Sequence, residues 1–178
     1  MSKKMERLLE SISTVIGTDA SNAYAEGTVS QGTRASAAQE AKHIKVILDD
    51  LIAKHGQDTA RSIMRPCGHQ CISAAIIEEA KAAYQRMEGL QAFLDDLNSN
   101  HIGGGQLRLA GDVIVGIYDR CYCNTARNTE NMSPVYCECS AGWYEKLFSS
   151  VFEKPVGVVV KKSIVRGDAT CEFEISRT

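Results

Sequence analysis

Apolar residues recur at helical spacing through the first part of the chain. Residues 5, 8, 9, 12 and 16 are Met, Leu or Ile, and this spacing places them on one stripe of a helix. A second stripe covers 44–52 and stops at Gly56, because glycine is a common helix end. Asp58 is a suitable N-cap for a third, short helix, and Pro66 is expected to end it.

Two more helices are predicted before residue 98. The first starts near Cys71 and reaches Gly89, and the second covers 90–97. The polar stretch 17–36 interrupts the pattern and is expected to be a loop, with helical content at most. The sequence therefore predicts helices across most of residues 2–97, followed by a glycine-rich breaker at 98–105.

From residue 106 the apolar period changes from helical to two residues. Leu107 and Leu109 alternate with polar residues, a Gly-Asp turn follows at 111–112, and 113–118 continues as a strand. A long loop, 119–139, leads to a helix capped by Ser140 and blocked by Pro155. Strands over 156–165 and 170–175 then flank an Arg-Gly-Asp turn.

These patterns predict an α+β protein. Residues 1–105 form a helical part, and 106–178 form a cysteine-rich β-β-α-β-β part. The helices are expected to pack with an antiparallel sheet of about four strands, crossed by one helix, in one compact domain. In the last strand Cys171 alternates with polar neighbours, so its side chain should face the core.

Composition excludes several classes of partner. The 178 residues have a net charge of −2 with interspersed signs, which leaves no basic field for nucleic acid or anionic lipid. The pairs Lys3-Lys4 and Lys161-Lys162 are interpreted as solvated surface. No apolar run is long enough to cross a membrane, and the N-terminus resembles an amphipathic helix rather than a targeting segment. We therefore predict a cytoplasmic protein, for which a homodimer is left open.

Seven cysteines carry the candidate chemistry. Their odd number and the absence of a signal segment favour metal binding or reactivity over disulfides, with inert packed thiols as the alternative. Cys121/Cys123 and Cys137/Cys139 are C-x-C pairs, and an extended chain turns residues i and i+2 to one side. Four such thiolates suffice for zinc or an iron–sulfur cluster. Alternatively, one cysteine of each pair binds and the other packs.

A different motif, Cys67-Gly68-His69-Gln70-Cys71, stands where a helix is predicted to begin. The positive end of the helix dipole would lower the pKa of both thiols, and the spacing would put them on one helix face. His69 adds a base or a nitrogen ligand. Cys67, His69 and Cys71 are therefore the catalytic candidates, with helix packing as the alternative.

Residues 142–175 resemble the 4-vinyl reductase domain family. The resemblance lies in the helix start Gly142-Trp143, the turn Lys154-Pro155-Val156 and the ending 167–175. The same ending resembles aminothiazoline-carboxylate hydrolases and a group of cysteine-rich bacterial and archaeal proteins. The resemblance implies a pocket between helices and sheet for a small apolar or aromatic molecule. Leu94, Val115 and Trp143 are expected to line it.

The sensor members of that family hold zinc through cysteines, and the resemblance implies the same here. Cys139 and Cys171 match two of the family's ligands, whereas the third ligand position is Ser163 in this chain. Serine is a poor zinc ligand, so the inherited site is incomplete. The missing thiolates would come from Cys137, or from Cys121 and Cys123.

Three hypotheses follow. The first is a small-molecule-binding or sensing protein with a cysteine-ligated zinc beside an apolar pocket. The second is a hydrolase of a small heterocyclic or thiol compound, using a zinc-bound water or a cysteine nucleophile. The third is an iron–sulfur or redox protein. A closed set of four protein ligands favours the first, three ligands and a water favour the second, and visible colour would indicate an iron–sulfur cluster.

Overall fold

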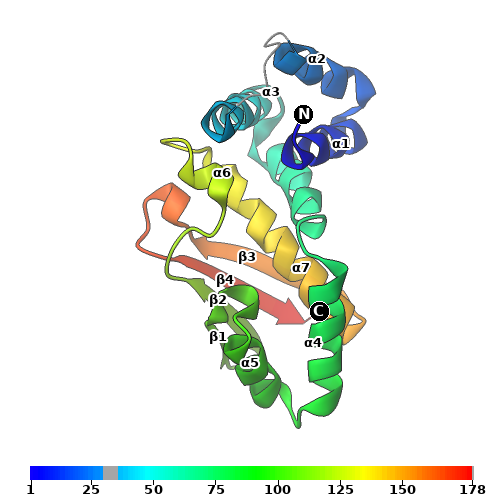
Figure 1. Cartoon of the computed structure of the whole chain (residues 1–178), viewed down its shortest axis with the longest axis vertical. Helices are drawn as coiled ribbons and strands as arrows, with labels where there is room; N and C mark the ends of the chain where they lie inside the picture. The colour runs from blue at the N-terminus through cyan, green and yellow to red at the C-terminus, as the bar shows by residue number, and fades with distance from the viewer. Residues whose placement is uncertain (30–35, 178) are drawn as a thin grey trace.

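The structure, a computed structural model, describes residues 1–29 and 36–177 (Figure 1). Its helices are α1 (Lys3–Ile16), α2 (Thr18–Val29), α3 (Ala37–His69), α4 (Ala74–Arg86), α5 (Leu90–Ser99), α6 (Asn124–Arg127) and α7 (Glu138–Phe152). The strands are β1 (Leu107–Ala110), β2 (Val113–Tyr118), β3 (Val156–Lys162) and β4 (Cys171–Arg177). Three 3₁₀ helices join them: η1 (Ile102–Gly105), η2 (Pro134–Cys137) and η3 (Ile164–Arg166).

The four strands form one antiparallel sheet in the order β1-β2-β4-β3. Helix α7 lies across this sheet, and α1 and α2 lie at the far end of the molecule (Figure 1). Ile114 pairs with Ile175 and Gly116 with Phe173, and alternation turns the large apolar side chains of both strands to the covered face. The predicted α+β class and four-stranded antiparallel sheet are confirmed, and Cys171 is buried as expected.

The hydrophobic core consists of two clusters. One lies between the sheet and α4, α5 and α7, and it includes Phe93, Phe148 and Phe173. The other joins α1 and α3 to the segment that contains α6 and η2, and it includes Leu48 and Val135. This second cluster combines residues from both sides of position 105, so the apolar core is not divided where the sequence period changes.

Helices α3 and α7 touch through two glycines. A Cβ atom on Gly68 would lie 2.0 Å from the carbonyl oxygen of Cys139, and one on Gly142 would lie 2.0 Å from the carbonyl oxygen of Arg65. These distances are far below van der Waals contact, so only glycine permits this approach. The last turn of α3 is thereby held against the first turn of α7.

Some predicted boundaries are wrong. Residues 18–29 of the expected loop form helix α2, whose Ser21 hydroxyl donates to the Leu9 carbonyl, while 30–35 lie outside the described residues. The helix expected to end at Pro66 continues to His69. The predicted break at Gly56 is present, because its backbone, at φ 82° and ψ 166°, is not helical and kinks α3 there. The contact with α7 outweighs the hydrogen bond that proline removes.

The helix predicted to start near Cys71 begins at Ala74, capped by Ser73. Cys71 therefore follows the C-terminus of α3. The prediction that it stands at a helix N-terminus is wrong. Helix α7 begins at Glu138, before the predicted Ser140 cap, and β3 ends at Lys162. Among the described residues, no helix is both long and apolar enough to cross a membrane.

Candidate functional site

The structure divides the seven cysteines into two groups. Cys67, Cys71, Cys123 and Cys139 line one pocket. Cys137 and Cys171 form a second group, with Cys121 nearby. Each C-x-C pair therefore contributes one thiol to each group, so its two sulfurs do not turn to one point. Cys137 and Cys139 lie in helical backbone, where residues i and i+2 do not share a face, and not in the expected extended chain. Cys123 does have extended backbone, but its thiol lies against Tyr136 and lines the pocket, whereas Cys121 does not line it.

The pocket lies between α1, α3 and the segments around Cys123 and Cys139. Its cavity volume is about 50 Å³. The non-cysteine lining residues are Lys4, Arg7, Leu8, Ile44, Met64 and Tyr136. The lining therefore combines apolar side chains with four thiols and two cations.

Cys71 is an exposed thiol of the pocket with a lowered pKa. Arg7 Nη1 donates a hydrogen bond to its sulfur at 3.2 Å, and the Cys139 thiol lines the same pocket. Interaction with the Cys139 thiol and the charges of Arg7 and Lys4 outweigh burial and lower the pKa of Cys71 from 9.0 to about 6. The pKa of Cys139 is raised by the same interaction and by burial of its thiol. At neutral pH the pair is therefore one thiolate and one thiol.

Cys123 is held in a similar way. Burial opposes ionisation of this thiol, but the Tyr136 hydroxyl at 3.1 Å and the Lys4 ammonium at 3.3 Å lower its pKa. Lys4 also donates to the Thr125 hydroxyl at 2.7 Å, which fixes the ammonium group. Lys4 was expected to be solvated surface, and Arg7 and Tyr136 carried no signal in the sequence, since only the tertiary fold places them beside a thiol.

Two of the three catalytic candidates do not fit the predicted role. Burial raises the pKa of Cys67 to about 12, and its thiol donates to the carbonyl oxygens of Ile63 and Arg7 at 3.5 and 3.6 Å. The predicted low pKa of Cys67 is therefore wrong. His69 is exposed, and its Nε2 lies 3.3 Å from a Glu145 carboxylate oxygen outside the pocket. Of the three candidates, only Cys71 combines an exposed thiol with a lowered pKa, and catalysis by these residues stays a prediction.

The second group is buried. Cys137 Sγ lies 2.8 Å from the hydroxyl oxygen of Ser163, and the Ile164 backbone N–H donates to Cys171 Sγ at 3.4 Å. A hydrogen bond from Cys137 lowers the pKa of Cys171 to about 7 and raises that of Cys137. Ser163, the position that departs from the family's zinc ligands, thus binds a thiol. Cys137, not Cys139, is the neighbour of Cys171.

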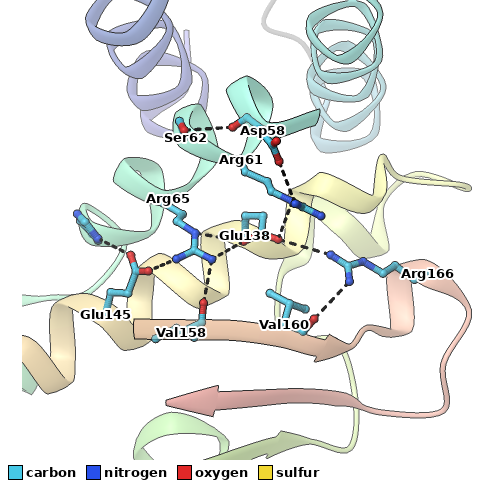
Figure 2. Close-up of polar contacts among 10 residues, drawn as sticks. Asp58, Arg61, Ser62, Arg65, Glu138, Glu145, Val158, Val160 and Arg166 are labelled. Atoms are coloured by element: carbon cyan, nitrogen blue, oxygen red, sulfur yellow. Dashed lines mark hydrogen bonds and ion pairs between the residues drawn. The ribbon is translucent and has the colours of Figure 1, made fainter. Parts of the chain in front are cut away.

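Glu138, the central residue of the second C-x-C pair, is a buried carboxylate surrounded by three arginines (Figure 2). Arg65 Nη2 lies 3.0 Å away, and Arg61 and Arg166 approach at 3.6 and 3.5 Å. Arg65 also donates to the Val158 carbonyl at 2.9 Å. This network holds the 137–139 segment between α3, η3 and β3, and so positions a cysteine on each side of Glu138. The sequence held no signal for this network, because its members lie far apart in the chain.

The predicted metal ligands were Cys121, Cys123, Cys137, Cys139 and Cys171. As arranged, they do not form one ligand set, because they divide between two groups. Among the residues that the structure describes, no three His, Cys, Asp or Glu side chains are placed to hold a metal ion. Zinc and iron–sulfur binding therefore stay predictions.

The predicted apolar pocket involves Leu94, Val115 and Trp143. Leu94 is fully buried in the core cluster between the sheet and the helices, and the partly buried Trp143 packs against the same cluster. Val115 points to the opposite side of β2 from Ile114. Between α7 and the sheet, the rings of Tyr118, Tyr144 and Phe173 pack with centroids 5.2–5.7 Å apart. Ligand contact at the three predicted residues stays a prediction.

Comparison with known proteins gives one family. The family described as "Family of unknown function (DUF6144)" matches residues 2–178. No curated protein matches the chain. One similar solved structure is the crystal structure of the phenol-responsive sensory domain of the transcription activator PoxR with phenol. Its sequence identity is 14%, it covers 80% of this chain and 75% of its own, and the TM-score is 0.48. The 4-vinyl reductase resemblance of 142–175 is not among these findings and stays a prediction.

Proposed function

The chain belongs to the DUF6144 family, and we propose that it is a small-molecule-binding or sensing protein whose ligand bonds to the Cys71 thiolate. The observation that carries this proposal is an exposed thiol at a preformed pocket, with the Arg7 guanidinium bound to its sulfur and Cys139 in the same lining. At pH 7 a thiol with a pKa of about 6 is ionised in about nine molecules of ten, whereas one with a pKa of 9.0 is ionised in about one of a hundred.

The size of the pocket limits what enters it. Its volume of about 50 Å³ is smaller than the ~150 Å³ cavity that accommodates benzene in an engineered protein core. The ligand therefore inserts a small reactive group, and the rest of the molecule stays at the open side near Cys71. A small electrophile fits this description better than a fully enclosed aromatic ring.

The charges at the pocket favour an acidic ligand. In the free protein the Arg7 guanidinium is paired with the Cys71 thiolate. When Cys71 forms a thioether or a disulfide, its negative charge disappears and Arg7 is left unpaired. A carboxylate on the ligand would then take the place of the lost charge. The proposed ligand class is therefore a small thiol-reactive molecule that carries a carboxylate.

Binding is favoured over hydrolysis. Hydrolysis of a covalent intermediate needs a base that activates water. Among the described residues that line the pocket, none is His, Asp or Glu, and His69 is paired with Glu145 elsewhere. A ligand joined to Cys71 through a thioether would therefore not be removed by hydrolysis.

Two alkylating reagents of nearly equal size test this proposal: iodoacetate, which carries a carboxylate, and neutral iodoacetamide. We expect both to modify Cys71 first, as read by peptide mass spectrometry, with a rate that rises through about pH 6. The ratio of the iodoacetate rate to the iodoacetamide rate should exceed that of a free low-molecular-weight thiol, and Arg7→Gln should lower it. Modification of another cysteine first, or a midpoint near pH 9, would refute the proposal.

A further inference from the structure

Cys71 and Cys139 are two thiols of one pocket, on chain segments whose backbones are in contact. The contact at Gly68 places the Cys139 peptide directly against the last turn of α3, three residues before Cys71. The Cys139 side chain faces the same pocket as Cys71. The glycine contact therefore holds the two segments together, and both thiols line the one small pocket that these segments share.

We propose that Cys71 and Cys139 are a redox-active pair that reduces low-molecular-weight disulfides and forms a reversible disulfide in the pocket. This inference rests on the proposed role of Cys71 as the ligand-binding thiolate. It adds a substrate class, a disulfide of the form R–S–S–R, and a second residue with a defined part in the reaction. A disulfide of a carboxylate-bearing thiol would also meet Arg7.

The reaction takes two steps. The Cys71 thiolate attacks one sulfur of R–S–S–R, the S–S bond breaks, and RS⁻ leaves, so that Cys71 is joined to R–S in a mixed disulfide. Cys139 then loses its proton to solvent and attacks the Cys71 sulfur, and the second RS⁻ leaves. The two protein thiols are oxidised by two electrons, and the small disulfide is reduced to two thiols.

The surroundings of the two cysteines decide which thiol attacks the small disulfide first. Cys71 is exposed, so it meets the small disulfide first, whereas Cys139 is partly buried behind it. Cys67 lines the same pocket, but its thiol is bound to two carbonyl oxygens. The other neighbouring thiols, Cys137 and Cys171, are only 7% and 4% exposed, which keeps a small disulfide away from them.

Oxidised glutathione, a carboxylate-bearing disulfide, tests the inference on the full reduced chain under anaerobic conditions at pH 7. We expect wild-type protein to lose two hydrogens without retaining glutathione, and peptide mapping without reductant to join residues 71 and 139. Cys139→Ser should accumulate one glutathione on Cys71, because the second step is blocked. Cys71→Ser should not react, and the control Cys137→Ser should behave as wild type.

Two results would overturn the inference: a wild-type protein that keeps glutathione on Cys71, or a disulfide that forms between other cysteines. Cys139→Ala is a second variant, in case serine disturbs the fold, and circular dichroism checks that each variant is folded. Because the iodoacetate experiment needs only Cys71 and Arg7, it can succeed while this one fails. The ligand-binding proposal would then stand without the redox reaction.

Discussion

The contact between α3 and α7 gives a strong structural prediction, which Gly68→Ala tests. The new Cβ atom would lie 2.0 Å from the Cys139 carbonyl oxygen and 2.7 Å from the Trp143 backbone nitrogen. Both are backbone atoms, which have no rotamer to change. The two helices must therefore move apart at the position where Cys71 meets Cys139.

The magnitude follows from the geometry. Ordinary contact begins at 3.4 Å, so the 2.0 Å approach must open by about 1.4 Å. Overpacking of this kind costs about 1–3 kcal/mol or more, whereas alanine in place of a helical glycine returns about 0.5–1 kcal/mol. We expect a net loss of about 2 kcal/mol, or a melting temperature lower by about 4–8 °C for a chain of this length.

Urea and thermal denaturation measure the stability, and the pH dependence of iodoacetamide alkylation measures the thiol pair. Because separation weakens the interaction with Cys139, the midpoint for Cys71 should rise from about 6 toward 9.0. Gly27→Ala is the matched control, since Gly27 lies in α2 with nothing within 4 Å of a new Cβ atom. The control should be unchanged or slightly stabilised. If Gly68→Ala is as stable as the control and keeps the low midpoint, the close approach of the two helices is wrong.

Three further predictions concern other parts of the site. Glu138→Gln should lower the free energy of unfolding, measured by urea denaturation, by about 2–3 kcal/mol, because three partly exposed guanidinium groups lose their common carboxylate. A loss below about 0.5 kcal/mol would contradict the stabilising role of this network. Wild-type protein should gain stability relative to Cys71→Ser as pH rises from about 6 to 9. In this range the Cys71 thiol has already lost its proton in the folded state but still holds it in the unfolded state. A relative loss of stability over this range would contradict the lowered pKa. Elemental analysis of native protein tests for zinc. If zinc is present and lies in the pocket, Cys139→Ser should release it and Cys171→Ser should not. The opposite result would place the metal at Cys137 and Cys171.

The architecture was largely predictable from apolar periodicity. The period changed near residue 105, and the helices and strands on each side follow from it. Helix α2 was missed because its sequence is polar and its stabilising contacts are tertiary, such as the hydrogen bond between Tyr24 and Asp50. Pro66 was expected to end a helix because its effect was judged locally, whereas the contact of α3 with α7 holds the helix beyond it.

The site was predictable as a set of residue types and not as an arrangement. The cysteines were identified, and the structure divides each C-x-C pair between two groups. The alternative that one cysteine of each pair binds and the other packs stays a prediction. That Cys71 would meet Cys139 could not be inferred, because it depends on the helix crossing at Gly68 and Gly142. Two glycines within helical sequence were the available signal for this crossing. The low pKa of Cys71 was predicted for the wrong reason. Cys139, Arg7 and Lys4 lower it, whereas the prediction attributed it to a helix N-terminus.

The central claim is that Cys71 is a thiolate at neutral pH. The ultraviolet absorbance of thiolates, recorded as the difference between wild-type protein and Cys71→Ser during an anaerobic pH titration, measures it directly. The account predicts one thiol that titrates near pH 6 in the wild type and is missing from the variant. A difference that appears only near pH 9 would show that Cys71 is an ordinary thiol and would contradict the account.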